Sequence, residues 1–292
     1  MIILAVVLAL LAALGNAAAS VLQRRAAATD LSTSVGGRLT GRLAGRFGFV
    51  RLRVWRWGAG LLALSGAAQA LALAAGPLAV VQPVMTTELL FTLVLAAVVF
   101  RWPPGAGTWA AFLAMALGLA VFLLLASPGG GMETVPPKRW LVSAVPALLV
   151  SIVLIVVGRR LRGSARAAVL GSVTAIGFSF TAALIKDALG LVPDGPGDLF
   201  TAWQLYTAAA VGLASFLMLQ ATLRAGSLAA SQPALTLGDS LLSVILGVSL
   251  FGESIALGWR VLPELASLGL VAFACVRLSR SPLVSGKESQ RW

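Results

Sequence analysis

Histidine is missing from this chain of 292 residues, and cysteine occurs once, as Cys275. Without histidine the chain lacks the commonest general base and the commonest transition-metal ligand of proteins. A single cysteine excludes a disulfide framework and a metal site built from several thiolates. Because a catalytic centre needs a nucleophile–base pair or a metal constellation, these shortages argue against an enzyme, and we expect no cofactor.

Charged residues are also scarce, at 11% of the chain, whereas hydrophobic residues make up 59%. A soluble domain carries about 25% charged residues. So few polar residues could not cover a soluble surface of this size, but a lipid bilayer accepts an apolar exterior. The net charge of +12 does not indicate nucleic-acid binding, because the basic residues fall in loops between apolar runs.

Long apolar runs fill most of the sequence. A membrane-spanning helix needs about 20 mostly apolar residues, so these runs predict an all-α integral membrane protein with nine transmembrane helices. The nine runs are 2–22, 57–75, 77–100, 108–126, 140–157, 167–187, 200–221, 227–251 and 259–278.

The basic residues are distributed unevenly between the two sides of these spans. If the first span runs from outside to inside, 18 of the 22 Lys and Arg lie in cytoplasmic segments. Cytoplasmic loops of membrane proteins collect Lys and Arg. We therefore expect a multi-pass protein of the cell membrane with its N-terminus outside and its C-terminus in the cytoplasm.

The longest loop, residues 23–56, holds eight of the basic residues. Arg38, Arg42 and Arg46 repeat every four residues and would share one side of a helix. Such a helix is suited to lie on anionic lipid. A flexible basic loop is the alternative, because three glycines in the same stretch oppose helix formation.

Residues 76–86 resemble residues 226–236 at an offset of 150 residues. Six of the paired positions are identical, including a glycine, a Gln-Pro pair and a threonine. Other similar pairs follow in the same order, so the first four spans repeat as the last four, with the fifth between them. Because each copy comes five spans after its original and five is odd, the copies cross the membrane in opposite directions, as in many secondary transporters.

This repeat divides the chain into four parts. The first transmembrane repeat, with the basic cytoplasmic loop, occupies residues 1–127, and a linker that contains the fifth helix occupies 128–166. The second, inverted repeat occupies residues 167–280, and a cytoplasmic tail occupies 281–292. The expected fold is therefore an inverted 4+1+4 arrangement.

The repeated motif places polar groups inside two spans. Pro83 and Pro233 predict helix kinks at equivalent depths. In a membrane, the carbonyl freed by a kink must find a partner or line a wet cavity. Gln82 and Gln232 precede the prolines, so we expect them on a central cavity. Helix packing around a kink is the alternative.

Two acidic residues lie at the centres of spans 3 and 8, as Glu88 and Asp239. A charge at the bilayer centre costs about 2.5–3.5 kcal/mol on insertion scales, so such residues are candidates for function. We expect at least one of them to face a cavity and to couple substrate movement to a proton or cation. A structural hydrogen bond to a neighbouring helix is the alternative. Asn16 in span 1 is a further candidate for the cavity lining.

Charged residues also gather at the outer ends of spans 8 and 9. Arg260 and Glu264 are four residues apart and predict a salt bridge that Glu253 could join. We expect these three residues to form an outer gate or a salt bridge. Trp203 and Tyr206 open span 7 and are typical of the aromatic belt at a membrane interface.

The two Gln-Pro pairs, the Leu250–Glu253 end of span 8 and the glycine-containing span after it resemble the drug/metabolite transporter superfamily. The resemblance extends over essentially the whole chain. That superfamily usually has ten spans in two inverted five-helix halves, whereas here the basic loop 23–56 replaces one helix. The nine-span pattern, with Trp57 and Gly58 opening span 2, is similar to the EamA-like branch that includes NIPA-type magnesium transporters. The first half ends in Val99–Arg101, where relatives often have Gly-Glu.

The repeat and the resemblance together imply a secondary transporter. Its substrate would be a small metabolite or a cationic drug, moved by alternating access, with proton coupling as one mode. One alternative is a permease for magnesium or another divalent cation, because the cavity candidates offer the oxygen ligands that hard cations prefer. A non-transporting membrane scaffold is a second alternative. The partners we expect are the substrate, the bilayer and anionic lipid at the basic loop, and we also consider a homodimer.

Overall fold

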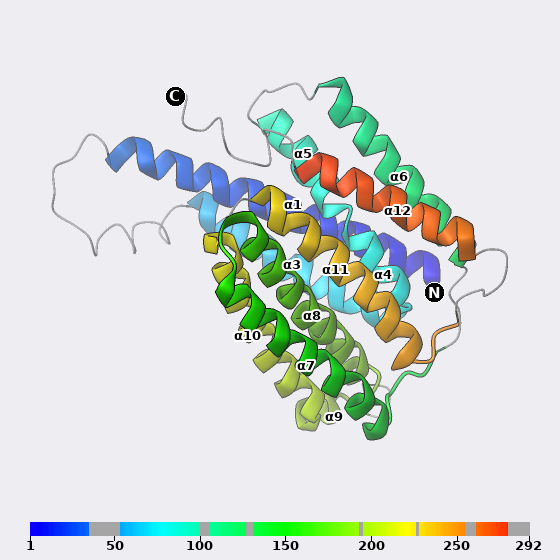
Figure 1. The fold of residues 1–292 in the computed structure, drawn as a ribbon. Coiled ribbons are helices and arrows are strands. Elements are labelled where there is room, and N and C mark those ends of the chain that lie inside the picture. Colours follow the sequence, from blue (N-terminus) through cyan, green and yellow to red (C-terminus); the bar gives the residue numbers. More distant parts are fainter. Residues whose placement is uncertain are drawn as a thin grey trace.

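The computed structural model describes residues 1–34, 53–99, 105–126, 131–192, 195–225, 228–254 and 261–279. The described residues form helices and no β-strand (Figure 1), which confirms the all-α expectation. The helices are α1 (Ile2–Ser34), α3 (Arg53–Ala75), α4 (Leu78–Met85), α5 (Glu88–Val99), α6 (Ala106–Ala126), α7 (Pro137–Arg160), α8 (Gly163–Leu189), α9 (Pro196–Thr201), α10 (Trp203–Ala225), α11 (Leu228–Ser249) and α12 (Val261–Ser279).

Six of the described segments are long and apolar enough to cross a bilayer. They are Ile2–Leu22, Trp57–Ala75, Leu78–Val99, Pro137–Arg160, Gly163–Leu189 and Trp203–Ala225. Shorter apolar helices occupy Ala106–Phe122, Ala234–Ser249 and Ala266–Arg277. The structure thus supports a multi-helix membrane protein with six helices of spanning length in its described part, and the nine-span repeat stays a prediction. The basic stretch around Arg38, Arg42 and Arg46 lies outside the described residues.

The third apolar segment consists of two helices, α4 and α5, separated by a tight turn. Thr86 N–H donates to the Pro83 carbonyl at 3.2 Å and Thr87 N–H donates to the Val84 carbonyl at 3.0 Å. Both bonds reach back three residues instead of the usual four. The hydroxyls of the two threonines donate to the same carbonyls, each at 2.7 Å. The predicted kink at Pro83 is thus a break that follows it, and Glu88 becomes the first residue of α5.

Helix α4 lies at the centre of the molecule and all eight of its residues are buried. It contacts α1, α3, α6, α8 and α11 (Figure 1). Helix α7, in contrast, packs mainly on α8 and exposes much of its apolar surface, as expected of a helix that faces lipid. The break between α4 and α5 is therefore surrounded by other helices and shielded from lipid, where irregular backbone is tolerated in a membrane.

Small residues bring three pairs of helices close together. A Cβ added to Gly15 of α1 would lie 3.0 Å from the Cβ of Ser65 on α3, and Gly177 of α8 meets Ser215 of α10 in the same way. Gly118 lets α6 approach the backbone of α12, and these two helices run side by side (Figure 1). Small residues at crossings are how membrane helices pack closely.

Candidate functional site

A cavity of about 710 Å³ lies among α1, α3, α4, α5, α8, α10 and α11. Cavities of about 300–1,000 Å³ are the usual size of small-molecule sites. Asn16, Gln82, Glu88 and Asp239 all line it. The two acidic residues that the sequence places at mid-span, 151 positions apart, therefore share one cavity. We call it the acidic cavity.

Glu88 is held by polar groups from α1 and α3. Asn16 Nδ2 donates to Glu88 Oε2 at 3.2 Å, and Ser65 Oγ donates to Asn16 Oδ1 at 2.6 Å. Asn16 Oδ1 and the Ala12 carbonyl, at 2.5 Å, share the single hydroxyl proton of Ser65, and with its amide oxygen facing Ser65 the NH₂ group of Asn16 faces the carboxyl group. Glu88 also begins α5, where the free N–H groups of a helix favour a negative charge.

Asp239 has a corresponding partner on α8. Ser179 Oγ donates to Asp239 Oδ1 at 2.7 Å, and Ser179 is completely buried. Among the described residues, Asp239 Oδ2 and Glu88 Oε1 accept no hydrogen bond. Each acid is thus fixed through one oxygen by a neighbouring helix, and its other oxygen remains available to a ligand in the cavity.

The sequence did not single out Ser65 or Ser179. A serine in an apolar helix usually bonds to the carbonyl four residues earlier, and the Ala175 carbonyl, at 2.9 Å, competes with Asp239 for the single hydroxyl proton of Ser179. The only sequence signal for these contacts was a nearby small residue. Gly15 and Gly177 lie one helix turn or less from Asn16 and Ser179, the residues that bind the acids. Gln232, Pro233 and Glu264 lie in helices whose side chains at those positions are outside the described part.

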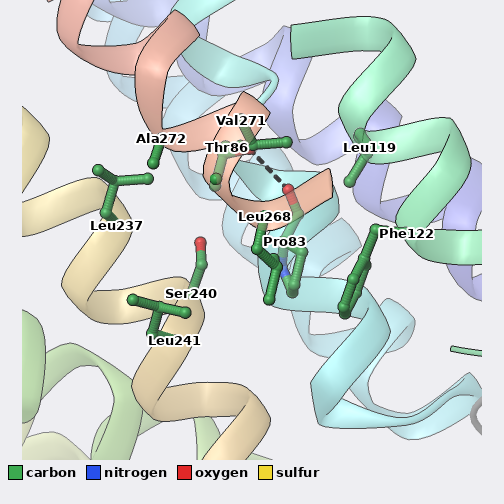
Figure 2. A pocket seen from close by; sticks show the side chains of 11 residues that line it. Pro83, Thr86, Leu119, Phe122, Leu237, Ser240, Leu241, Leu268, Val271 and Ala272 are labelled. Atoms are coloured by element: carbon green, nitrogen blue, oxygen red, sulfur yellow. Dashed lines mark hydrogen bonds between the residues drawn. The ribbon is translucent and has the colours of Figure 1, made fainter. Parts of the chain in front are cut away.

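A second cavity, of about 230 Å³, lies between α4, α6, α11 and α12. Figure 2 shows side chains from these four helices pointing into the space between them. Pro83, which the sequence marks as a kink, lines this cavity and not the acidic one. Thr86 and Ser240 line both cavities. We call the second cavity the apolar annex.

Glu253 forms the strongest polar cluster away from the cavities. The side chain of Glu253 is buried, and its two oxygens accept the N–H groups of Leu78 (2.7 Å) and Ala79 (2.9 Å) in the first turn of α4. A carboxylate at this position satisfies free N–H groups and the helix dipole together. Lys186 Nζ lies 3.4 Å from Glu253 Oε1 and donates to the Gly76 carbonyl at 2.6 Å.

Two glycines allow the Glu253 carboxyl group to reach the first turn of α4. Gly252 has a φ of 64°, a conformation that residues with a side chain rarely adopt, and it turns the chain back after α11. A Cβ at Gly247 would collide with the Glu253 carboxyl group. The expected partner Arg260 lies outside the described residues. In the structure Glu253 pairs with Lys186 of α8. The salt bridge therefore links the end of α11 to another helix.

Asp187 is a buried acid that the sequence analysis missed. Its two oxygens accept the Val135 N–H at 2.7 Å, Trp140 Nε1 at 2.9 Å and Gln204 Nε2 at 3.1 Å. Trp140 also stacks edge-on with Trp203, at 5.9 Å between ring centroids. At the end of an apolar run Asp187 looked like an ordinary helix terminus, because its partners come from other helices.

We expect Asp187→Ala to destabilise the protein by about 3 kcal/mol or more, because each buried donor left unpaired costs about 1–3 kcal/mol. Denaturant unfolding in detergent micelles, followed by tryptophan fluorescence, measures this. The matched control is Asp198→Ala, which removes an exposed acid in α9 and should change stability by less than about 0.5 kcal/mol. Equal stability of the two variants would contradict the role of Asp187.

Comparison with known proteins gives little functional guidance. No protein-family model matches the sequence, and no solved structure matches it. The chain is 29% identical over 287 residues to an uncharacterized protein of Corynebacterium glutamicum, and the match covers 96% of both chains. That similarity brings no assigned activity.

Proposed function

We propose that this chain is a secondary transporter that moves a small organic cation through the acidic cavity by alternating access. The observation that carries the proposal is the convergence of Glu88 and Asp239, from α5 and α11, on one cavity among apolar helices. Carboxyl groups inside a membrane are costly, and they commonly mark substrate or proton pathways.

Similar contacts at two places support the inverted repeat on which this mechanism rests. Asn16 of α1 holds Glu88, and Ser179 of α8 holds Asp239. The tight crossing of α1 with α3 also resembles that of α8 with α10. In transporters built from inverted repeats, one repeat rocks against the other around a site at mid-membrane, and this site often includes a broken helix such as α4–α5.

The chemistry of the carboxyl pair suggests a form of coupling. An ionised carboxylate attracts a cation, and the same group releases that cation when it takes up a proton. Exchange of the substrate for protons at Glu88 and Asp239 would then drive transport in the direction set by the proton gradient. In this proposal the N-terminus lies outside and the C-terminus in the cytoplasm, as the distribution of basic residues indicates.

No observation favours the magnesium permease over an organic cation carrier. A cage of protein ligands for a hard cation needs six or more oxygen atoms, whereas Mg²⁺ that keeps several waters needs one or two carboxylates. Within the described residues, no three Asp, Glu, Cys or His side chains come together.

A binding screen followed by a flux measurement tests the proposal. We expect organic ammonium ions at 100 times their Kd to stabilise the purified protein by about 2.7 kcal/mol, seen as a raised Tm, because they bind only the folded state. In vesicles, their uptake should respond to an imposed pH gradient. Stabilisation by magnesium alone would favour the permease. A protein that binds and carries none of these solutes would leave the scaffold as the better explanation.

A further inference from the structure

The apolar annex differs in chemistry from the acidic cavity beside it. Its walls are aliphatic and aromatic side chains from four helices, among them Leu119, Phe122, Leu237, Leu268 and Val271 (Figure 2). None of the described residues that line it is acidic or basic. It is therefore suited to an uncharged, apolar group.

The two cavities adjoin at the residues nearest the acids in sequence. Thr86 and Ser240 line both cavities; Thr86 lies two residues before Glu88, and Ser240 directly follows Asp239. Their hydroxyl groups donate to carbonyls of their own helices, Thr86 to Pro83 at 2.7 Å and Ser240 to Thr236 at 3.0 Å. Both hydroxyl protons at the boundary between the cavities are therefore engaged, and an apolar group can lie against it without leaving a donor unpaired.

The volume of the annex sets the size of the group it can hold. A cavity of about 150 Å³ binds benzene. At about 230 Å³ the annex has room for a larger compact group, such as a fused bicyclic ring. Each methylene removed from water tightens binding by about fourfold, so filling this space contributes more affinity than a small polar solute could gain there.

We propose that the annex binds the apolar group of the transported solute while Glu88 and Asp239 hold its ammonium group. The substrate class is then an amine that carries one compact apolar group a few bonds from its nitrogen. This inference rests on the proposed function, because it assigns a second subsite to the same transport cavity.

Replacing one of three glycines can fill the annex, the acidic cavity or, as a control, neither of them. A Cβ added at Gly269, Gly66 or Gly60 meets no atom within 4 Å. Gly269 lines the annex, Gly66 lines the acidic cavity and Gly60 lines neither. Replacement by leucine at each position therefore adds the same side chain to a helix at three different places. Ala272→Phe provides a second way to fill the annex.

The probes are 2-(1-naphthyl)ethylamine and ethylamine, and calorimetry on the purified full chain measures the Kd of each. We expect the wild type to bind the naphthyl amine at least 30-fold more tightly. Gly269→Leu and Ala272→Phe should weaken the naphthyl amine at least tenfold and leave ethylamine unchanged. Gly66→Leu should weaken both amines, and Gly60→Leu should weaken neither.

The outcomes separate this inference from the proposed function. Equal binding of the naphthyl amine by Gly269→Leu, Ala272→Phe and Gly60→Leu, with ethylamine still bound, would overturn the annex subsite and leave the cation site intact. A wild type that binds neither amine would overturn both. Thermal unfolding of each variant identifies any that fail to fold, and the two annex variants provide independent evidence.

Discussion

Glu88→Gln and Asp239→Asn are each expected to lower the uptake of an organic ammonium ion into vesicles by about 100-fold. Both replacements preserve the size of the side chain and an oxygen that can accept from Asn16 or Ser179. What they remove is the negative charge, and loss of a charge from a hydrogen-bonded pair costs about 2–5 kcal/mol, or at least 30-fold in affinity. Initial rates of uptake at matched protein density provide the measurement.

The control for this pair is Asp198→Asn, the same loss of charge at an exposed position in α9. Its uptake should equal that of the wild type. The variants should also unfold within about 1 kcal/mol of the wild type, since their hydrogen-bond partners remain satisfied. Normal uptake by both Glu88→Gln and Asp239→Asn would show that the acids serve only to tie α5 and α11 to their neighbours.

Apolar runs were sufficient to locate the helices, because a helix in lipid must satisfy all its backbone groups internally. They could not predict the break between α4 and α5. That break depends on the hydroxyls of Thr86 and Thr87, which stabilise the carbonyls near Pro83. In sequence, two threonines between apolar residues are equally compatible with an unbroken helix, where their hydroxyls bond back to the preceding turn.

The sequence predicted part of the candidate site and missed the rest, as it did for the fold. Acids in the middle of apolar runs are rare, so Glu88 and Asp239 could be found from their position alone. Asn16, which holds Glu88, was also a candidate, but Ser179, which holds Asp239, and Ser65, which holds Asn16, were not, because their contacts depend on the rotation of each helix about its axis. An apolar surface on all sides of a helix leaves that rotation undetermined.

The structure explains the Leu250–Glu253 motif at the end of span 8 in a way that the sequence could not. The prediction was that Glu253 could join a salt bridge between Arg260 and Glu264, and the contacts that the structure describes for Glu253 are with Lys186 and with the first turn of α4, about 175 residues away. Gly252 and Gly247 are needed because the chain must turn sharply and the carboxyl group must pass close to α11. The glycines near Glu253 are thus explained by the role of Glu253 as a cap for another helix, α4.

Lys186→Met is expected to destabilise the protein by about 3–5 kcal/mol, because it leaves the buried Glu253 carboxylate without its cation. Glu253→Gln should be destabilising for the opposite reason and should also weaken the start of α4. With both replacements together no unpaired charge remains. The double variant should therefore lose at least about 2 kcal/mol less than the sum of the single losses, as residues in one network do.

Denaturant unfolding of the four proteins in one detergent measures this coupling, and Lys138→Met is the control because Lys138 is exposed at the start of α7. Additive losses would mean that Lys186 and Glu253 do not interact, and that each acts only on the backbone of α4 or on Gly76. Coupling would establish that a residue pair from α8 and the end of α11 holds the break between α3 and α4. Because α4 lines both cavities, this pair would also fix the position of one of their walls.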